Sequence, residues 1–142
     1  MANRPDTWQV LEETKLTLAA LTGTQFEVGQ SLIIPRRHAP TLFDLTEEES
    51  VAIITAARRV GKALVEALHP LGVLLYQNNG VYSGQEVPHF HLHVVPRQPG
   101  SDWGVGPPQL ATLERRGRST PRPLASAEQL RDTADSIRAV LT

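Results

Sequence analysis

The stretch QEVPHFHLHVVPR, residues 85–97, holds three of the chain's five histidines at alternate positions: His89, His91 and His93. Alternation of this kind is typical of a β-strand, in which side chains two residues apart point to the same face at a spacing of about 6.6 Å. We therefore expect a strand over residues 89–97 with the three imidazoles in a row on one face. The apolar residues between them would form the opposite face, suited to packing under a helix.

Length and composition favour a single domain. The chain has 142 residues, of which 40% are hydrophobic and 20% charged, and a formal net charge of -1. This near-neutral charge argues against nucleic-acid binding. The absence of cysteine excludes disulfides and Cys-rich zinc sites. The opening MANRPDTWQV lacks a signal segment, and no stretch approaches the roughly 20 apolar residues that span a bilayer. We expect no membrane contact and a cytoplasmic location.

The order of predicted elements indicates an α+β fold with a mostly antiparallel, five-stranded sheet. Thr46 and Glu49 form a capping box that begins a long amphipathic helix, which ends before Pro70. A second capping box, Ser126 with Gln129, begins a C-terminal helix. Four apolar runs predict the strands that precede the histidine strand: 8–11, 15–21, 30–35 and 72–79.

We expect three regions along the chain. The core covers about residues 8–103, a Pro- and Gly-rich extended segment follows over 104–125, and residues 126–142 form the C-terminal helix. The connection GVYSGQEVP, residues 80–88, is longer than a tight hairpin needs, which makes it a candidate functional loop.

The histidine row has two chemical interpretations. In the first, an H-x-H pair binds zinc with a third ligand such as His38 or Glu86. However, His89 and His93 would lie about 13 Å apart on a straight strand, too far to share an ion whose bonds to nitrogen are about 2.0–2.1 Å. In the second, one imidazole attacks phosphorus while its neighbours, the Gln85 amide and backbone N–H groups hold the phosphate oxygens. This interpretation uses all three histidines and requires no metal or other cofactor.

The segment HFHLHVV resembles the signature of the histidine-triad (HIT) superfamily, His-φ-His-φ-His-φ-φ with φ apolar, at every position. GQSLIIPRRHA, LFDLTEEE, NNGVYSGQ and HVVPR also follow the order found in that family, and the resemblance is closest to fragile-histidine-triad-like and bacterial HIT-family hydrolases. It implies one HIT-like domain over residues 1–142 and a homodimer. It also implies a nucleotide hydrolase or nucleotidyl transferase that acts on a purine nucleotide conjugate, such as a dinucleoside polyphosphate or a phosphoramidate.

The resemblance assigns roles to individual residues. His91 would attack the α-phosphorus and form a nucleotidyl-histidine, while His93 and His89 would orient the phosphate. The residues expected to bind substrate are Asn78, Gly84, Gln85, Glu86, Thr22, Leu18, Ile33 and His38. Leu18 and Ile33 would line the base slot, and His38 would lie at the cleft edge or make a structural hydrogen bond.

Two positions depart from the family pattern. Glu86 stands where many members carry Ser or Thr beside the leaving group, and Thr22 stands where relatives often place Asp or Asn on the ribose. These departures leave a second interpretation open, a nucleotide-binding sensor or scaffold whose chemistry is vestigial. Trp103 is a candidate for selecting substrate at the partner's site, and Arg97 for attracting a second phosphate.

Overall fold

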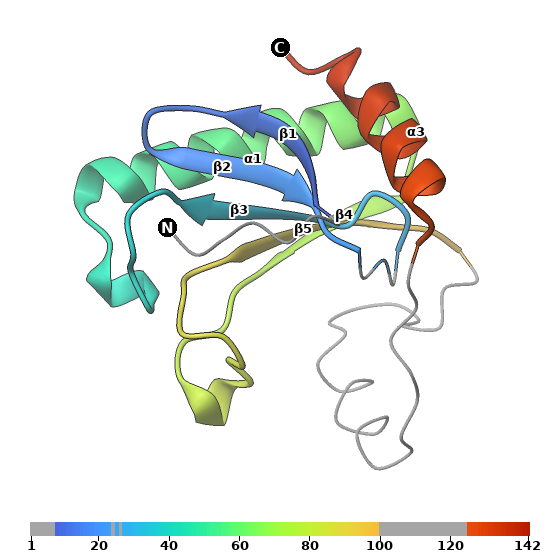
Figure 1. Ribbon diagram of the computed structural model, residues 1–142. Coiled ribbons are helices and arrows are strands. Elements are labelled where there is room, and N and C mark those ends of the chain that lie inside the picture. The colour runs from blue at the N-terminus through green and yellow to red at the C-terminus, as the bar shows by residue number, and fades with distance from the viewer. Residues whose placement is uncertain (1–7, 24, 26, 100–124) are drawn as a thin grey trace.

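The computed structural model describes residues 8–23, 25, 27–99 and 125–142, and it has the expected α+β architecture. Five strands form one antiparallel sheet in the spatial order β1-β2-β3-β5-β4 (Figure 1). The strands are β1 (Gln9–Glu13), β2 (Thr17–Leu21), β3 (Ser31–Pro35), β4 (Gly72–Tyr76) and β5 (Leu92–Arg97).

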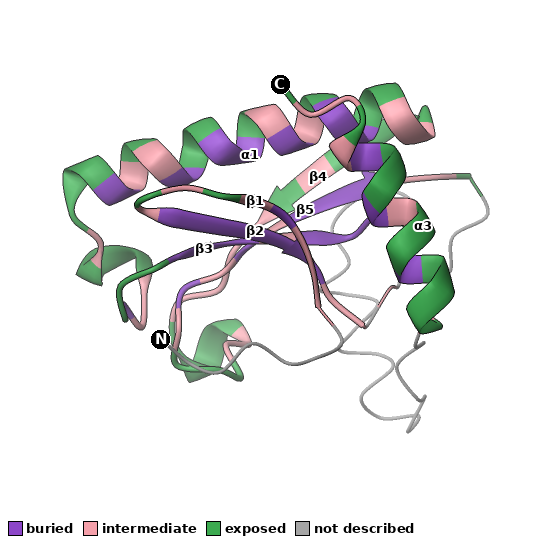
Figure 2. Cartoon of the chain, turned by 45° about the horizontal axis from the view of Figure 1, so that its top comes forward, coloured by how far each residue is buried: buried purple, intermediate pink, exposed green. Residues whose placement is uncertain are grey.

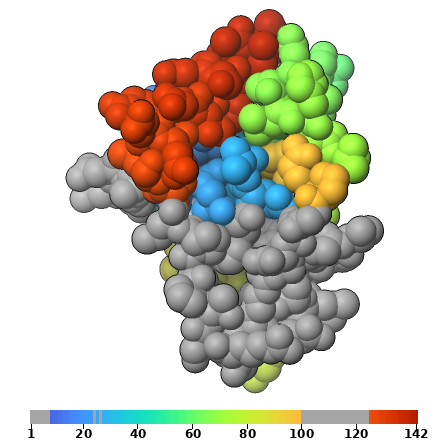
Figure 3. All heavy atoms as spheres, turned by 90° about the vertical axis from the view of Figure 1, so that its right-hand side faces the viewer, coloured from blue at the N-terminus to red at the C-terminus, as the bar shows by residue number. Residues whose placement is uncertain are grey.

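Two helices lie on the same side of this sheet: α1 (Glu47–Leu68) and α3 (Ala127–Arg138). Both begin at the predicted capping boxes, because the side-chain oxygens of Thr46 and Ser126 each accept a hydrogen bond from a backbone N–H three residues later, at 3.1 Å. The α3 spheres lie directly beside those of α1 in Figure 3. The predicted long helix and C-terminal helix are thus confirmed.

The hydrophobic core fills the space between the sheet and these helices (Figure 2). Leu64 of α1 and Ile137 of α3 are fully buried there. Phe90, Leu92 and Val94 join the same core, which confirms that the apolar side of the histidine segment supports the long helix. β5 is therefore held in place by the packing on its helix-facing side.

The expected strand over residues 89–97 is wrong at its start, because β5 begins only at Leu92. The backbone N–H of Phe90 donates to the carbonyl of Ala39 at 2.7 Å, in the loop that follows β3. His89 and His91 consequently lie on irregular backbone just before the strand, and only His93 lies within it. The three imidazoles do not form the straight row that a continuous strand would give.

The predicted extended segment lies almost entirely outside the described residues, as does Trp103. Among the helices that the structure describes, none is long and apolar enough to cross a membrane.

Candidate active site

Two loops meet beside the histidines. One follows β3 and contains the short 3-10 helix η1 (Leu42–Asp44); the other joins β4 to β5 and contains η2 (Val81–Ser83). Asn79 Oδ1 accepts a hydrogen bond from the Leu42 N–H at 2.8 Å, and Gln85 Nε2 donates to the Pro40 carbonyl at 2.6 Å. The two loops therefore form one connected frame around the triad.

His91 is half-buried, and its ring is oriented by the backbone carbonyl two residues before it. The Nδ1 atom lies 2.9 Å from the carbonyl oxygen of His89. Since a carbonyl can only accept, Nδ1 must carry the proton when this hydrogen bond forms, and the neutral ring keeps its lone pair on Nε2. This is the tautomer that a nucleophilic imidazole requires.

His93 packs face to face with Tyr76, the residue opposite it on β4, with ring centroids 4.1 Å apart and planes 9° apart. Its ring also contacts that of His91 edge-on, with centroids 4.8 Å apart. Burial, and to a smaller extent the nearby His91, lower the pKa of His93 to about 3. His93 is therefore neutral near pH 7.

His89 lies against His38 instead of the other triad rings. Its Nε2 atom is 3.3 Å from the Pro35 carbonyl, and its Nδ1 atom is 3.4 Å from Nδ1 of His38. Burial lowers the pKa of His89, while the hydrogen bond to Pro35 acts in the opposite direction. His38 is exposed and its Nδ1 atom lies beside His89, and its predicted role, at the cleft edge or in a structural hydrogen bond, stays a prediction.

Gln85 holds the loop that carries it. Its Oε1 atom accepts from the Gly80 N–H at 2.6 Å, and its Nε2 atom donates to the carbonyls of Pro40 and Val87. Both amide protons and the oxygen are thereby engaged within the frame. A direct contact of this side chain with phosphate, as the sequence suggests, requires at least one of these bonds to break.

Asn78 and Gly84 lie next to each other: a Cβ atom on Gly84 would stand 3.6 Å from Asn78 Nδ2. Within the described residues the Asn78 side chain makes no hydrogen bond. It is therefore available to a ligand. Glu86 is exposed in the same loop, between the two anchored residues Gln85 and Val87.

The two predicted base-slot residues lie on opposite faces of the sheet. Ile33 pairs with Leu92 and is fully buried in the core under α1. Leu18 pairs with Ile34, which stands two residues from the Leu32 that faces His93, so the pleat places Leu18 on the histidine side. Thr22 follows directly after β2 and is half-buried.

Ile33 faces the core under α1 and not the triad, so it cannot line a base slot beside the histidines. Arg97, the candidate for a second phosphate, instead donates from Nε to Glu27 at 3.1 Å, and both side chains are mostly buried.

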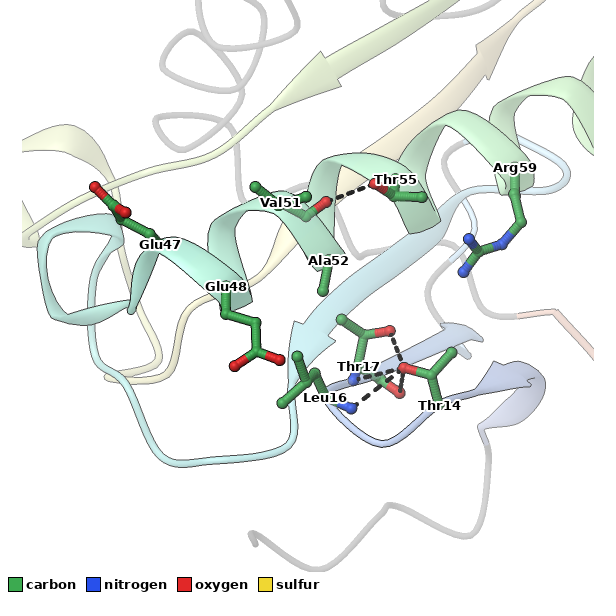
Figure 4. A pocket seen from close by; sticks show the side chains of 9 residues that line it. All are labelled: Thr14, Leu16, Thr17, Glu47, Glu48, Val51, Ala52, Thr55 and Arg59. Atoms are coloured by element: carbon green, nitrogen blue, oxygen red, sulfur yellow. Dashed lines mark hydrogen bonds between the residues drawn. The ribbon is translucent and has the colours of Figure 1, made fainter.

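Among the described residues, two hollows lie away from the triad. One, of about 580 Å³, lies between α1 and the turn after β1, where Glu48 and Arg59 extend from the helix above Thr14 and Leu16 (Figure 4). The other, of about 460 Å³, lies between α1 and the edge strand β4. Neither is lined by a histidine. In the described part of the chain, no group of three or more His, Asp or Glu side chains could hold a metal ion.

Two contributors to the site were not predicted. The stacking of Tyr76 on His93 follows from the β4–β5 register, which single-sequence periodicity does not give. The pair formed by Arg37 and Glu49 beside His38 is not predictable from the capping box, which accounts for Glu49 without Arg37. The adjacent basic residues in PRRHA were the only sequence signal.

Comparisons with known proteins show which family this chain resembles. The HIT domain family model matches residues 4–100. The adenosine 5'-monophosphoramidase hnt1 of Schizosaccharomyces pombe is 34% identical over 96 residues, 68% of each chain. The asymmetrical bis(5'-nucleosyl)-tetraphosphatase of the same yeast is 34% identical over 90 residues, which cover 63% of this chain and 50% of that protein.

The protein hit of Bacillus subtilis is 32% identical over 85 residues, and the chain spans 59% of its length. Among solved structures, a Hit-like protein from Bartonella henselae superposes with a TM-score of 0.77 at 26% identity, covering 94% of this chain and 87% of that one. Together with the family match over most of the chain, these likenesses identify the protein as a member of the histidine-triad (HIT) family.

Proposed function

We propose that this protein is a nucleotide hydrolase or nucleotidyl transferase that acts at the α-phosphate of a purine nucleotide conjugate through a nucleotidyl-histidine on His91. The observation that carries the proposal is the hydrogen bond from His91 Nδ1 to the His89 carbonyl, which leaves the lone pair on Nε2. The names of two relatives, a phosphoramidase and a dinucleoside tetraphosphatase, support the substrate class.

The reaction has two displacements. In the first, the Nε2 lone pair of His91 forms a bond to the α-phosphorus, and the bond from phosphorus to the leaving oxygen or nitrogen breaks with its electron pair, after which the leaving atom takes a proton. In the second, water attacks phosphorus and loses a proton, and the P–N electron pair returns to Nε2. The products are a nucleoside monophosphate and the free imidazole.

His93 and His89 serve this chemistry as neutral groups, because burial lowers the pKa of both. The buried Nδ1 of His93 has no hydrogen-bond partner among the described residues. A proton on Nε2 avoids burying an unpaired N–H and gives His93 a donor for a phosphate oxygen. The charge that develops on the phosphate oxygens would then be stabilised by neutral, fixed hydrogen-bond donors more than by positively charged imidazoles.

The remaining substrate contacts belong to the same proposal. Asn78 offers a side-chain amide beside Gly84, and Leu18 lies on the histidine side of the sheet, which supports a ribose–phosphate contact and a base contact respectively. Glu86 gives the leaving-group side of the loop an acidic residue, and Thr22 remains a candidate near the ribose. His38 would act by supporting His89.

The experiment compares binding with turnover. Wild-type protein and His91→Ala are given a diadenosine polyphosphate or an adenosine phosphoramidate, with AMP binding measured in parallel. The proposal predicts turnover by the wild type, also in excess EDTA, and binding without turnover by the variant. Binding by the wild type with no turnover of any such conjugate would favour the sensor, and loss of activity in EDTA would favour a metal hydrolase.

A homodimer is part of this proposal and is supported by the edge strand. Among the described strands β4 pairs with β5 alone, and Val73 and Leu75 on its helix-facing side are 36% and 51% exposed. These residues and Val65 of α1 border the hollow of about 460 Å³. An apolar edge of this kind is stabilised when a second copy covers it.

The test is the molar mass in solution, measured by light scattering or sedimentation. Leu75→Glu should give a monomer, whereas Val28→Glu, at a residue 62% exposed elsewhere, should leave the dimer intact. A wild-type monomer at assay concentrations would contradict the proposed dimer without affecting the chemistry at His91.

A further inference from the structure

We infer that Arg37 and Glu49 form a positioning pair that fixes the backbone on which the triad's first histidine and the Gln85 loop are held. The inference rests on the proposed function, because it assigns these two residues an indirect part in that reaction. Among the described residues, no hydrogen bond or ring contact joins either side chain to a triad ring. Their effect passes through backbone carbonyls of the loop after β3.

The pair has the geometry of a planar fork on a carboxylate. Arg37 Nε donates to Glu49 Oε1 at 2.8 Å, and Arg37 Nη2 donates to Oε2 at 2.9 Å. The Glu49 side chain is only 6% exposed, and Oε2 also accepts from the Thr46 N–H at 2.8 Å. Two parallel charge-assisted hydrogen bonds fix orientation as well as distance. The guanidinium is thereby attached to the first turn of α1.

The same guanidinium binds the loop backbone. Nη2 donates to the Asp44 carbonyl at 2.6 Å, and Nη1 donates to the His38 carbonyl at 3.3 Å. Arg37 therefore joins three points that are separate in sequence: the His38 peptide, the end of η1 and the N-terminus of α1. A capping box alone would need Glu49 but would not need Arg37.

The loop held in this way supplies the acceptors on which the site depends. The carbonyl of Pro35 lies 3.3 Å from His89 Nε2, that of Ala39 accepts from the Phe90 N–H at 2.7 Å, and that of Pro40 accepts from Gln85 Nε2 at 2.6 Å. These carbonyls stand on either side of the peptide that Arg37 binds. A displacement of that peptide would shift the His89 backbone, and His89 in turn accepts the hydrogen bond from His91.

The pair is built to persist under assay conditions. The hydrogen bond from Arg37 holds the pKa of Glu49 at about 2, well below its usual value, against the opposing effect of burial. Glu49 therefore stays ionised from pH 4 upward, and acidification within that range does not release the loop. Substitution is needed to break the contact.

The neighbouring pair provides a matched control. Arg36 Nη1 donates to Glu13 Oε1 at 2.7 Å. The two arginines are similarly exposed, 40% for Arg36 and 51% for Arg37, but Glu13 is 35% exposed whereas Glu49 is 6% exposed. Arg36 also donates to the Thr14 carbonyl, in the turn after β1. Arg36→Met removes the same charge and the same type of ion pair one residue away, without touching the His38 peptide.

The experiment compares Arg37→Met, Arg37→Lys, Glu49→Gln and Arg36→Met by kinetics, thermal unfolding and NMR of the imidazole ¹⁵N signals. For Arg37→Met we expect a 10- to 100-fold fall in kcat with little change in KM, as a small misplacement of reacting groups can produce. We also expect shifted His89 and His91 ring signals. Arg37→Lys keeps the charge but loses the fork, so its kcat should recover only in part. Arg36→Met should match the wild type in kcat and ring signals.

The ring signals are read without substrate, so they test the pair even if no conjugate is turned over. Unshifted His89 and His91 signals in a folded Arg37→Met protein would overturn the inference, as would equal effects of Arg36→Met and Arg37→Met. A fall in melting temperature without any change in kcat or ring signals would also overturn it, since a purely structural ion pair predicts that result.

Discussion

The two faces of β5 differ in the chemistry of their side chains. On one face Leu92 and Val94 are buried against α1, and no polar atom needs a partner. On the other face His93 stacks on Tyr76, and its buried Nδ1 has no hydrogen-bond partner among the described residues. One strand therefore carries both the core and the candidate chemistry. Substitutions on the core face should therefore lower stability, and substitutions on the histidine face should lower activity, even though the residues alternate along one strand.

The largest expected effect is on the histidine side. His91→Ala should lower kcat/KM by on the order of 10³-fold or more, because the nucleophile is removed. The free energy of unfolding should change by no more than about 1 kcal/mol, since the ring is only partly buried. His69→Asn is the control: His69 is exposed, caps α1 at φ 48°, and Asn tolerates that conformation. Comparable turnover by the wild type and His91→Ala would contradict the assignment of His91 as the nucleophile.

Ile33 tests the opposite face. Ile33→Ala should lower the free energy of unfolding by about 2–5 kcal/mol, the usual result of emptying a buried aliphatic site, with unchanged AMP affinity in the folded protein. Leu32→Ala, at the neighbouring residue that pairs with His93, should cost less stability and act on binding instead. Chemical denaturation and calorimetric titration provide the two measurements. Weaker AMP binding by Ile33→Ala alone would restore its predicted slot-lining role.

Two glycines with similar backbone angles extend the comparison. Gly29 and Gly84 have φ of +92° and +87°. A Cβ on Gly29 would stand 2.4 Å from Leu68 Cδ1, whereas one on Gly84 would meet only Asn78 Nδ2 at 3.6 Å. Gly84→Ala should therefore cost about 1–2 kcal/mol of stability from strain alone, and Gly29→Ala should cost about 1–3 kcal/mol more. Equal losses of unfolding free energy in denaturant titrations would contradict this difference, because they would show that the side chains around Gly29 rearrange at no extra cost.

The last test of the comparison concerns the pH dependence of stability. The folded-state pKa of His93 is about 3 and the ordinary value is 6.5, so below pH 6.5 the unfolded chain gains a proton that the folded chain does not accept. Stability should fall as the pH drops from 6.5 toward 3, by at most about 1.4 kcal/mol per unit from this group. His93→Phe keeps a ring on Tyr76 without titrating, so its curve should be flatter. Parallel wild-type and variant curves over this range would contradict the burial argument.

Much of the fold was predictable because its signals are local. Thr46 with Glu49 and Ser126 with Gln129 mark helix starts through contacts three residues apart, and both were found in place. The apolar residues between the histidines indicated the core face in the same way. The start of β5 was not predictable, because the Phe90 N–H binds Ala39, a partner distant in sequence that alternation cannot reveal.

The site shows the same division. The spacing of the three histidines in the sequence marks them as a candidate site. The tautomer of His91 depends on a contact with a residue only two positions away. The positions of Ile33 and Gln85 depend on strand register and on loop–loop contacts, which no local pattern contains. Tyr76 lies in the site because it pairs with His93 across the sheet, and this register is likewise absent from any local pattern.

The covalent step can be tested directly by trapping the enzyme during turnover. Wild-type protein is mixed with an adenosine phosphoramidate, quenched at a mildly basic pH that preserves phosphorus–nitrogen bonds, digested and mapped by mass spectrometry. We expect one AMP group on His91, absent from His91→Ala. Turnover with AMP attached to another histidine, or undiminished turnover by His91→Ala, would contradict it.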